Sequence, residues 1–255
     1  MLRTEREGKT LVWTLDRPAA RNALSAELLG ALRDAIRSAA GDASVRAAVL
    51  TGAGDAFASG GDLRELRDKT SAADAAMLTD AGEEVCRALG ELPFPVVAAL
   101  PGPAIGGGAE LALACDLRVA EARARICFKH ARMGATTSWG SLPRLYALVG
   151  PGAAARILLT SQELAAVEAR ACGLVDHVAD DGAGLAVALA WCADVAAGAP
   201  GAVAETKALL RAAGAAFYDQ TRALERAAFV RTWSSAEHAE AMTAYFERRP
   251  PHWTR

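Results

Sequence analysis

The sequence predicts an α/β fold in which buried strands alternate with helices and a helical region follows them. Short, continuous apolar runs such as Ala47–Leu50 and Pro95–Leu100 are typical of strands that are buried on both faces of a sheet. Between these runs apolar residues recur at helical spacing, and from Gly150 onward the helical pattern predominates. The chain has 255 residues, of which 52% are hydrophobic and 23% charged, so it can bury a sizeable core.

The N-terminal segment predicts a β-hairpin followed by a capped helix. The strands Leu2–Arg6 and Thr10–Leu15 flank a turn at Gly8. Pro18 stops the second strand, because proline offers no N–H group to a ladder. Ser25 is placed to cap a helix, whose apolar positions are Leu28, Leu29, Leu32 and Ile36.

The rest of the chain continues this alternation and then becomes helical. Further strands are expected at Ala47–Leu50, Pro95–Leu100, Leu117–Ala120 and Leu174–Val178. Helices are expected at Ala72–Gly90, Gly106–Cys115, Gly152–Leu159, Glu163–Ala171, Leu185–Ala197, Val203–Ala213, Phe217–Trp233 and Ala236–Phe246. No repeat, linker or block of charge marks a flexible boundary, so we expect an α/β core over residues 1–198 and a helical region over residues 199–255.

Charge and cysteine content exclude several classes of protein. The 28 Lys and Arg residues against 30 Asp and Glu give a net charge of −2, without the basic stripe of a nucleic-acid binder. The residues after Met1 lack the apolar stretch of a secretory signal, and no apolar run is long enough to cross a bilayer. The five cysteines form no C-x-x-C pair. We therefore expect a soluble cytoplasmic protein with reduced thiols and with no nucleic-acid or membrane partner.

Several catalytic signatures are missing from the sequence. There is no G-x-G-x-x-G dinucleotide fingerprint, no Walker-type phosphate loop and no G-x-S-x-G nucleophile elbow. The four histidines form no H-E-x-x-H motif or Cys/His cluster, so metal catalysis has no support.

Two glycine-rich junctions between a predicted strand and a helix remain, at Phe57–Leu66 and Ile105–Asp116. Glycine allows a ligand to approach the backbone closely, and the first N–H groups of a helix have no partner within it. Two such junctions side by side would form an oxyanion hole, in which one donor typically lowers a barrier by about 3–4 kcal/mol. Taken singly, each junction is equally well explained as a tight turn.

Together with their surroundings, these junctions resemble the crotonase (enoyl-CoA hydratase/isomerase) superfamily. The resemblance runs in order along nearly the whole chain. The supporting segments are Leu15–Leu24, Val45–Gly54, Ala112–Arg118, Leu142–Gly150, Ala165–Val178 and Tyr245–Pro251.

This resemblance implies a crotonase fold, with repeated ββα core units and a helical C-terminal region that drives assembly into a homotrimer or a dimer of trimers. It implies an acyl-CoA thioester as ligand, whose carbonyl oxygen lies between the backbone N–H groups of Gly61 and Gly107. No nicotinamide, flavin or metal is implied, and coenzyme A enters only as part of the substrate. The residues expected to bind the thioester and the CoA are Arg21, Asn22, Ala23, Leu24, Ala58, Ser59, Gly60, Gly61 and Gly106.

Hydratases of this family use two glutamates, and the chain matches only one of them. Glu110 follows the triple glycine by one residue, as in the family, but the second position falls on His130. Addition of water to a conjugated thioester requires a base for the water and an acid for Cα, both within hydrogen-bond reach. A Glu/His pair does this only with altered protonation states.

The stretch Phe128–Gly140 is similar to the ethylmalonyl-CoA decarboxylase branch, in which a histidine replaces the second glutamate. Decarboxylation needs an oxyanion hole for the enolate and one proton, which His130 can deliver at its ordinary pKa, with Glu110 as competitor or partner. Met133 and Trp139 are candidate pocket walls, although Trp139 is equally well placed for packing. We therefore predict an acyl-CoA lyase, favoured as a decarboxylase of a malonyl-type acyl-CoA.

Two alternatives stay open. One is an enoyl-CoA hydratase that uses Glu110 with His130 in place of the second glutamate, and the other is a non-catalytic relative that binds acyl-CoA. Glu110 and His130 also have purely structural interpretations, as a helix-dipole partner and a hydrogen-bonded core histidine. Structural or surface roles are expected for His177, His238 and His252, and loop-shaping roles for Asn22, Asp62 and Asp116.

Overall fold

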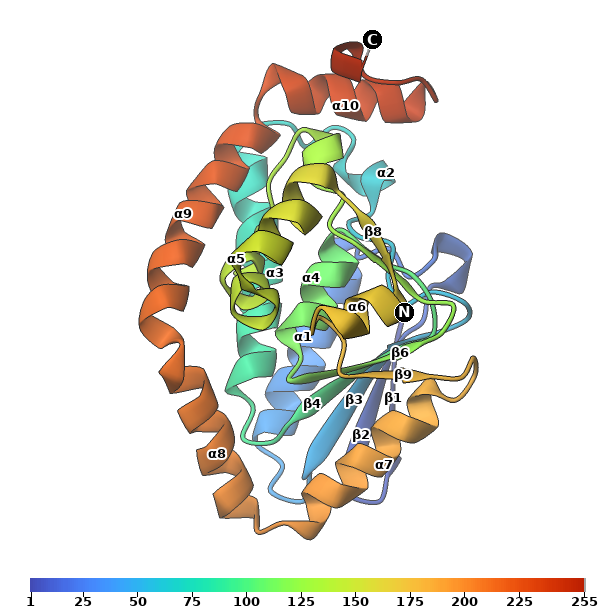
Figure 1. Ribbon diagram of the computed structural model, residues 1–255, viewed down its shortest axis with the longest axis vertical. Helices are drawn as coiled ribbons and strands as arrows, with labels where there is room; N and C mark the ends of the chain where they lie inside the picture. The colour runs from blue at the N-terminus through green and yellow to red at the C-terminus, as the bar shows by residue number, and fades with distance from the viewer. Residues whose placement is uncertain (255) are drawn as a thin grey trace.

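A twisted six-stranded sheet forms the centre of the molecule (Figure 1), whose computed structural model describes residues 1–254. The strand order is β1-β2-β3-β4-β6-β9, and only the β1–β2 pair is antiparallel. The strands are β1 (Leu2–Glu7), β2 (Thr10–Leu15), β3 (Ala47–Gly52), β4 (Val96–Leu100), β6 (Leu117–Glu121) and β9 (His177–Ala179). Parallel neighbours require crossover connections, and helices supply them.

The central strands are buried on both faces, as the apolar runs predicted. Leu50 in β3 faces the large core with α1 (Ala26–Ala40) and α3 (Ala72–Glu91). Its neighbour Val49 points to the opposite face, where α7 (Gly184–Ala197) covers the sheet. The side chain of Ser25 accepts a hydrogen bond from the N–H of Leu28, 3.2 Å away, so the predicted cap of α1 is confirmed.

A second, small sheet supports the buried helix α4 (Gly107–Ala114), every residue of which is buried. Its strands are β5 (Ala104–Ile105), β7 (Arg125–Cys127) and β8 (Glu163–Ala165). Because α4 follows β5 directly, the small sheet fixes the point at which the helix begins.

Helices form the remainder of the chain. α9 lies along α3 and α5 and closes one side of the molecule, and α10 lies across one end of it (Figure 1). The helices are α2 (Leu63–Leu66), α5 (Ser141–Thr160, with a break at Gly150), α6 (Ala166–Ala171), α8 (Pro200–Ala213), α9 (Ala215–Trp233) and α10 (Ala236–Phe246), with short 3-10 turns at Pro18–Ala20, Ala131–Met133 and His252–Thr254. The proposed boundary at 198/199 falls in the break between α7 and α8.

Three expected elements are wrong in their bounds. The helix expected over 152–159 is only the second half of α5, which begins at Ser141 and is broken at Gly150. The helix expected over 163–171 begins only at Ala166, because Glu163–Ala165 pairs with β7 and the Glu168 carboxylate accepts from the N–H of Ala165, 2.7 Å away. The strand expected over 174–178 begins only at His177. The N–H groups of Leu174 and Val175 are bonded instead to the Ala169 carbonyl, which closes the end of α6.

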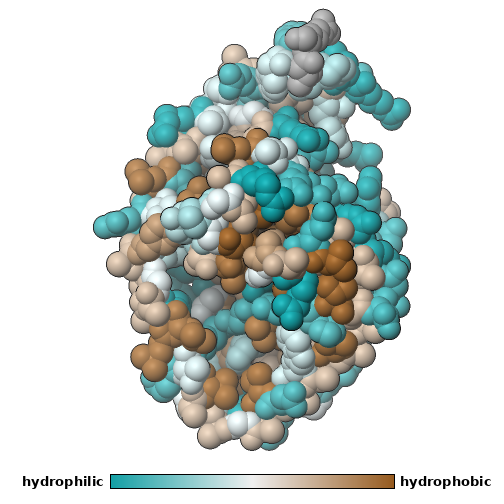
Figure 2. Space-filling model, in the orientation of Figure 1, coloured by the Kyte–Doolittle hydropathy of each residue, from teal (hydrophilic) through white to brown (hydrophobic). Residues whose placement is uncertain are grey.

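On the face shown in Figure 2, hydrophobic residues lie among hydrophilic ones and do not form one continuous surface. Among residues 1–254 no single helix is long and apolar enough to span a bilayer. Helices α7 and α8 taken together are long and apolar enough, but they are bent by 112° at the break between them.

Candidate active site

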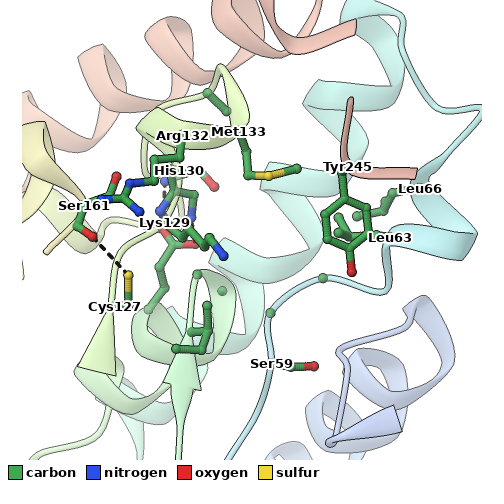
Figure 3. Close-up of a pocket in the computed structure, with 18 of the residues that line it drawn as sticks. Ser59, Leu63, Leu66, Cys127, Lys129, His130, Arg132, Met133, Ser161 and Tyr245 are labelled. Carbon is green, nitrogen blue, oxygen red and sulfur yellow. Dashed lines mark hydrogen bonds and ion pairs between the residues drawn. The ribbon is translucent and has the colours of Figure 1, made fainter. Parts of the chain in front are cut away.

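A cavity of about 560 Å³ lies where the loop before α2, the start of α4, the segment after β7 and the C-terminal helices meet (Figure 3). Lys129, His130 and Arg132 lie on one side of it, and Leu63, Leu66 and Tyr245 lie on the other. The cavity therefore has a basic side and a more apolar side. Of the predicted site residues, those that line it are Arg21, Ser59, Gly60, Gly61, Gly106, Gly107, Glu110, His130, Met133 and Trp139.

The two glycine-rich junctions lie next to each other in the cavity wall. Gly60 and Gly106 have φ angles of 93° and 53°, which favour glycine. A Cβ atom on Gly60 would lie 2.9 Å from the Ile105 carbonyl oxygen and 3.6 Å from the Gly107 nitrogen. The two backbones thus approach to a distance that only glycine permits.

Two backbone hydrogen bonds with Leu24, one donated and one accepted, hold the first junction in place. The Leu24 N–H group donates to the Gly60 carbonyl at 2.8 Å, and the Asp62 N–H group donates to the Leu24 carbonyl at 3.2 Å. Asp62 is further held by Arg17, whose guanidinium lies 2.9 Å from its carboxylate. The Gly61 N–H group, which lies between these two bonds along the chain, donates to no atom of the loop.

The N–H groups of Gly61 and Gly107 donate to no other group within residues 1–254. Gly107 is the first residue of α4, so its N–H has no partner inside the helix and lies at the positive end of the helix dipole. Both glycines line the cavity, which is where the sequence predicts that a negatively charged oxygen binds.

Glu110 and His130 form a hydrogen-bonded pair beside these amides. The Oε2 atom of Glu110 lies 3.1 Å from Nε2 of His130, and its Oε1 atom accepts from the N–H of Ser138 at 2.7 Å. Glu110 is only 2% exposed, and the His130 side chain is 13% exposed. Against a carboxylate, Nε2 of His130 is the donor. The Nδ1 atom is buried and has no hydrogen-bond partner among the described residues.

The Trp139 side chain both packs and lines the cavity. Its ring lies against two glycines: a Cβ on Gly82 would meet it at 1.9 Å, and one on Gly107 at 2.8 Å. The ring therefore covers the start of α4 next to a free amide. Met133 also lines the cavity, and its carbonyl oxygen accepts a hydrogen bond from Nδ1 of His238 at 2.6 Å.

The remaining predicted binding residues, Asn22, Ala23, Leu24 and Ala58, are buried behind the wall and do not line the cavity. Asn22 is fully buried and shapes the loop. Its Oδ1 atom accepts from the Arg17 N–H at 2.9 Å, and its Nδ2 group donates to the carbonyls of Ala53 and Ala56 at 3.0 and 2.8 Å.

Sequence reasoning missed the contribution of the C-terminal helices to the cavity. Phe229, Trp233, His238 and Tyr245 line it from α9 and α10. Phe229 and Trp233 are four residues apart, so they share one face of a helix, and this spacing indicates that the face is buried. The spacing does not indicate which part of the protein packs against that face. Basic residues were missed as well: Arg125, Lys129 and Arg132.

His238, for which the sequence predicts a structural or surface role, is buried inside this group. It is 2% exposed and stacks on the Trp233 ring with a centroid distance of 4.0 Å. Burial lowers the pKa of His238, although its hydrogen bond to Met133 opposes that shift. The described residues contain no cluster of three or more His, Cys, Asp and Glu side chains arranged to hold a metal ion.

The chain matches known proteins along its whole length. The sequence model for Enoyl-CoA hydratase/isomerase matches residues 5–255. The chain belongs to the enoyl-CoA hydratase/isomerase family. The fold and the superfamily predicted from the sequence, the crotonase superfamily, are thereby confirmed.

Individual members of this family are similar over nearly their full length. A protein of Mycobacterium bovis named Probable enoyl-CoA hydratase echA6 is 39% identical over 93% of this chain and 92% of its own. The Short-chain-enoyl-CoA hydratase of Clostridium acetobutylicum is 35% identical over 96% of this chain and 94% of its own. The crystal structure of an enoyl-CoA hydratase/isomerase from Pseudoalteromonas atlantica has a TM-score of 0.89 and 32% identity, and covers 98% of each chain.

Proposed function

We propose that this family member hydrates an enoyl-CoA thioester, with Glu110 and His130 as the acid–base pair. The observation that carries the proposal is the presence of two proton-transfer groups in contact, beside two free amides, in one cavity. Hydration needs both a base and an acid, whereas decarboxylation needs only an acid. The names of the relatives described above point in the same direction.

In the proposed reaction Glu110 takes a proton from water, and the water oxygen bonds to Cβ of the enoyl group. The π electrons move through Cα to the thioester oxygen, where the N–H groups of Gly61 and Gly107 stabilise the negative charge of the enolate. The enolate then collapses as Cα takes one proton from the pair, which has gained one from the water, so the pair returns to its starting state. His130 is placed to pass that proton on, because it is hydrogen-bonded to Glu110.

Decarboxylation of a malonyl-type acyl-CoA is the second candidate, and it is the reaction that the sequence favoured. Its support is His130 at the position of the second glutamate, together with the Trp139 ring over Gly107. A dry wall at that point favours departure of neutral CO2. The same two amides would hold the enolate, and one proton would then be delivered to Cα.

A substrate panel separates these possibilities. Loss of the crotonyl-CoA absorbance, with no CO2 released from methylmalonyl-CoA or ethylmalonyl-CoA, supports hydration. Release of CO2 without crotonyl-CoA hydration overturns hydration in favour of decarboxylation. Thermal stabilisation by acyl-CoA thioesters without turnover of any of them would identify a non-catalytic acyl-CoA binder.

The expected homotrimer, alone or as a dimer of trimers, stays our proposal for the assembly. It is supported by apolar side chains that α8 and α9 leave exposed, namely Leu209, Leu210 and Leu224. Light scattering of the purified protein tests it. We also propose a cytoplasmic location, which the free thiols of all five cysteines support.

A further inference from the structure

The loop that joins Thr137 to Leu142, here called the 137–142 loop, carries two parts of the site. The Ser138 N–H group donates to Glu110, and the Trp139 ring covers Gly107. The position of this one loop therefore sets both the orientation of the Glu110 carboxylate and the wall over an oxyanion donor.

One carboxyl oxygen of Glu225 joins the two ends of the 137–142 loop. Its Oε1 atom accepts from the Thr137 hydroxyl at 2.6 Å and from the Leu142 N–H at 2.8 Å. Glu225 belongs to α9, more than eighty residues further along the chain, and is only 5% exposed. It is not among the residues that line the cavity, so any effect on the reaction passes through the loop.

The bonding pattern of Glu225 fits a neutral carboxylic acid. Its Oε2 atom is buried and has no hydrogen-bond partner among residues 1–254. A charged oxygen would be very costly in that position, whereas a protonated one is less so. Burial, with a smaller contribution from Glu110, raises the pKa of Glu225 to about 8, against the opposing effects of Thr137, Leu142 and Arg144.

Arg144 holds the middle of the same loop, through hydrogen bonds of 2.7 and 3.0 Å to the carbonyls of Trp139 and Gly140. Loss of the Glu225 carboxyl would therefore displace the ends of the loop without releasing it. We propose that Glu225 is a positioning residue, which fixes the 137–142 loop so that the Ser138 N–H group orients Glu110. This inference rests on the proposed function only in so far as Glu110 transfers a proton in catalysis.

The test compares Glu225→Ala with Glu225→Gln. The Ser138 N–H group donates to the Glu110 carboxylate, so a displaced loop weakens or removes a hydrogen bond to the group that transfers the proton. We expect kcat of Glu225→Ala to fall about tenfold with a smaller change in KM, and the acid limb of its pH profile to move up by about one unit. Glu225→Gln keeps an uncharged oxygen that accepts from Thr137 and Leu142. This variant should therefore retain the wild-type kcat and the wild-type acid limb of the pH profile.

Two further variants control for loss of folding. Thr137→Val removes one of the two bonds to Glu225 and should move the acid limb in the same direction by a smaller amount. Arg226→Ala removes a two-bond ion pair between α9 and Asp80 of α3, at 2.6 and 2.7 Å, but leaves the loop bonds intact. It should lower thermal stability and leave the pH profile unchanged.

A readout without turnover keeps this inference separate from the proposed function. The NMR titration of the His130 ring reports on its partner Glu110 and should shift in Glu225→Ala but not in Glu225→Gln. If the wild-type protein turns over no acyl-CoA and this pattern holds, only the proposed function fails. If folded Glu225→Ala keeps the wild-type titration, or if Arg226→Ala changes it equally, the positioning role of Glu225 is overturned. If Glu225→Ala does not fold, the result for Thr137→Val decides.

Discussion

His130 donates from Nε2 to Oε2 of Glu110 across 3.1 Å, so the two groups named for proton transfer act on each other before any substrate arrives. The carboxylate orients the imidazole, in the way that a buried carboxylate orients the histidine of a catalytic triad.

Replacement of His130 separates proton transfer from simple orientation of Glu110. We expect His130→Ala to slow turnover about 10²–10⁴-fold, since a general acid of the pair is lost. His130→Gln keeps an N–H donor for Glu110 but cannot release a proton at neutral pH, so it should be slowed to a similar extent. Steady-state kinetics on the preferred thioester provide the measurement, and recovery of the rate in His130→Gln would leave His130 with an orienting role only.

Gly107→Ala tests the proposed oxyanion hole through steric crowding. A Cβ at this position would lie 2.8 Å from the tip of the Trp139 ring, so either the ring or the start of α4 must move. We expect kcat to fall about 10²–10³-fold, which is the usual cost of losing one oxyanion donor. Gly90→Ala is the matched control, because a Cβ there meets nothing within 4 Å. Equal kcat in the two variants would argue against the assignment of the Gly107 amide.

The central part of the site could be predicted from the sequence because its signals are local. The glycines at 60–61 and 106–107 each stand between a strand and a helix, and Glu110 lies one turn into the second helix. The contact of Glu110 with His130 depends on the pairing of β5 with β7, which no local pattern reveals. The sequence identifies His130 as a candidate only because it occupies the position of the second glutamate of the family.

The parts that sequence reasoning missed depend on contacts between distant segments. The three residues of β8 carry no strand pattern of their own and are defined by pairing with β7. Phe229 and Trp233 belong to a helix that was expected to serve assembly, and only the packing of α9 against α3 and α5 places them in the cavity wall. Glu225 is an unremarkable glutamate in the sequence until the fold buries it.

Lys207 attaches α8 to the core, and its loss should lower stability. The buried ammonium donates to the carbonyls of Leu89 and Phe94 at 3.0 and 2.9 Å, and to the Asp116 carboxylate at 2.8 Å. Lys207→Met leaves these acceptors without their donor, which should reduce the free energy of unfolding by about 2–4 kcal/mol. The loss stays below that of a fully buried pair, because the Asp116 side chain is partly exposed and water can solvate it. Denaturant titration at pH 7 measures the change.

Lys69→Met is the matched control for Lys207, because the Lys69–Glu65 ion pair lies at the surface, with side chains 43% and 33% exposed. Its loss should cost about 0–1 kcal/mol. If both lysine variants have the same stability as the wild-type protein, the attachment of α8 through Lys207 does not hold in solution.

His238 should make the protein less stable in mild acid. Burial lowers its pKa below the ordinary value of 6.5, so the folded state binds fewer protons than the unfolded state once the pH falls below about 6.5. The free energy of unfolding should therefore decline as the pH falls through this range. His238→Asn keeps a donor for the Met133 carbonyl and has no group that titrates there, so its decline should be shallower. Denaturant titrations at pH 7, 6 and 5 give the two slopes. His177 is exposed and provides the control, so His177→Asn should have the same slope as the wild-type protein. An equal effect of the two substitutions would contradict a specific role of the buried His238 ring.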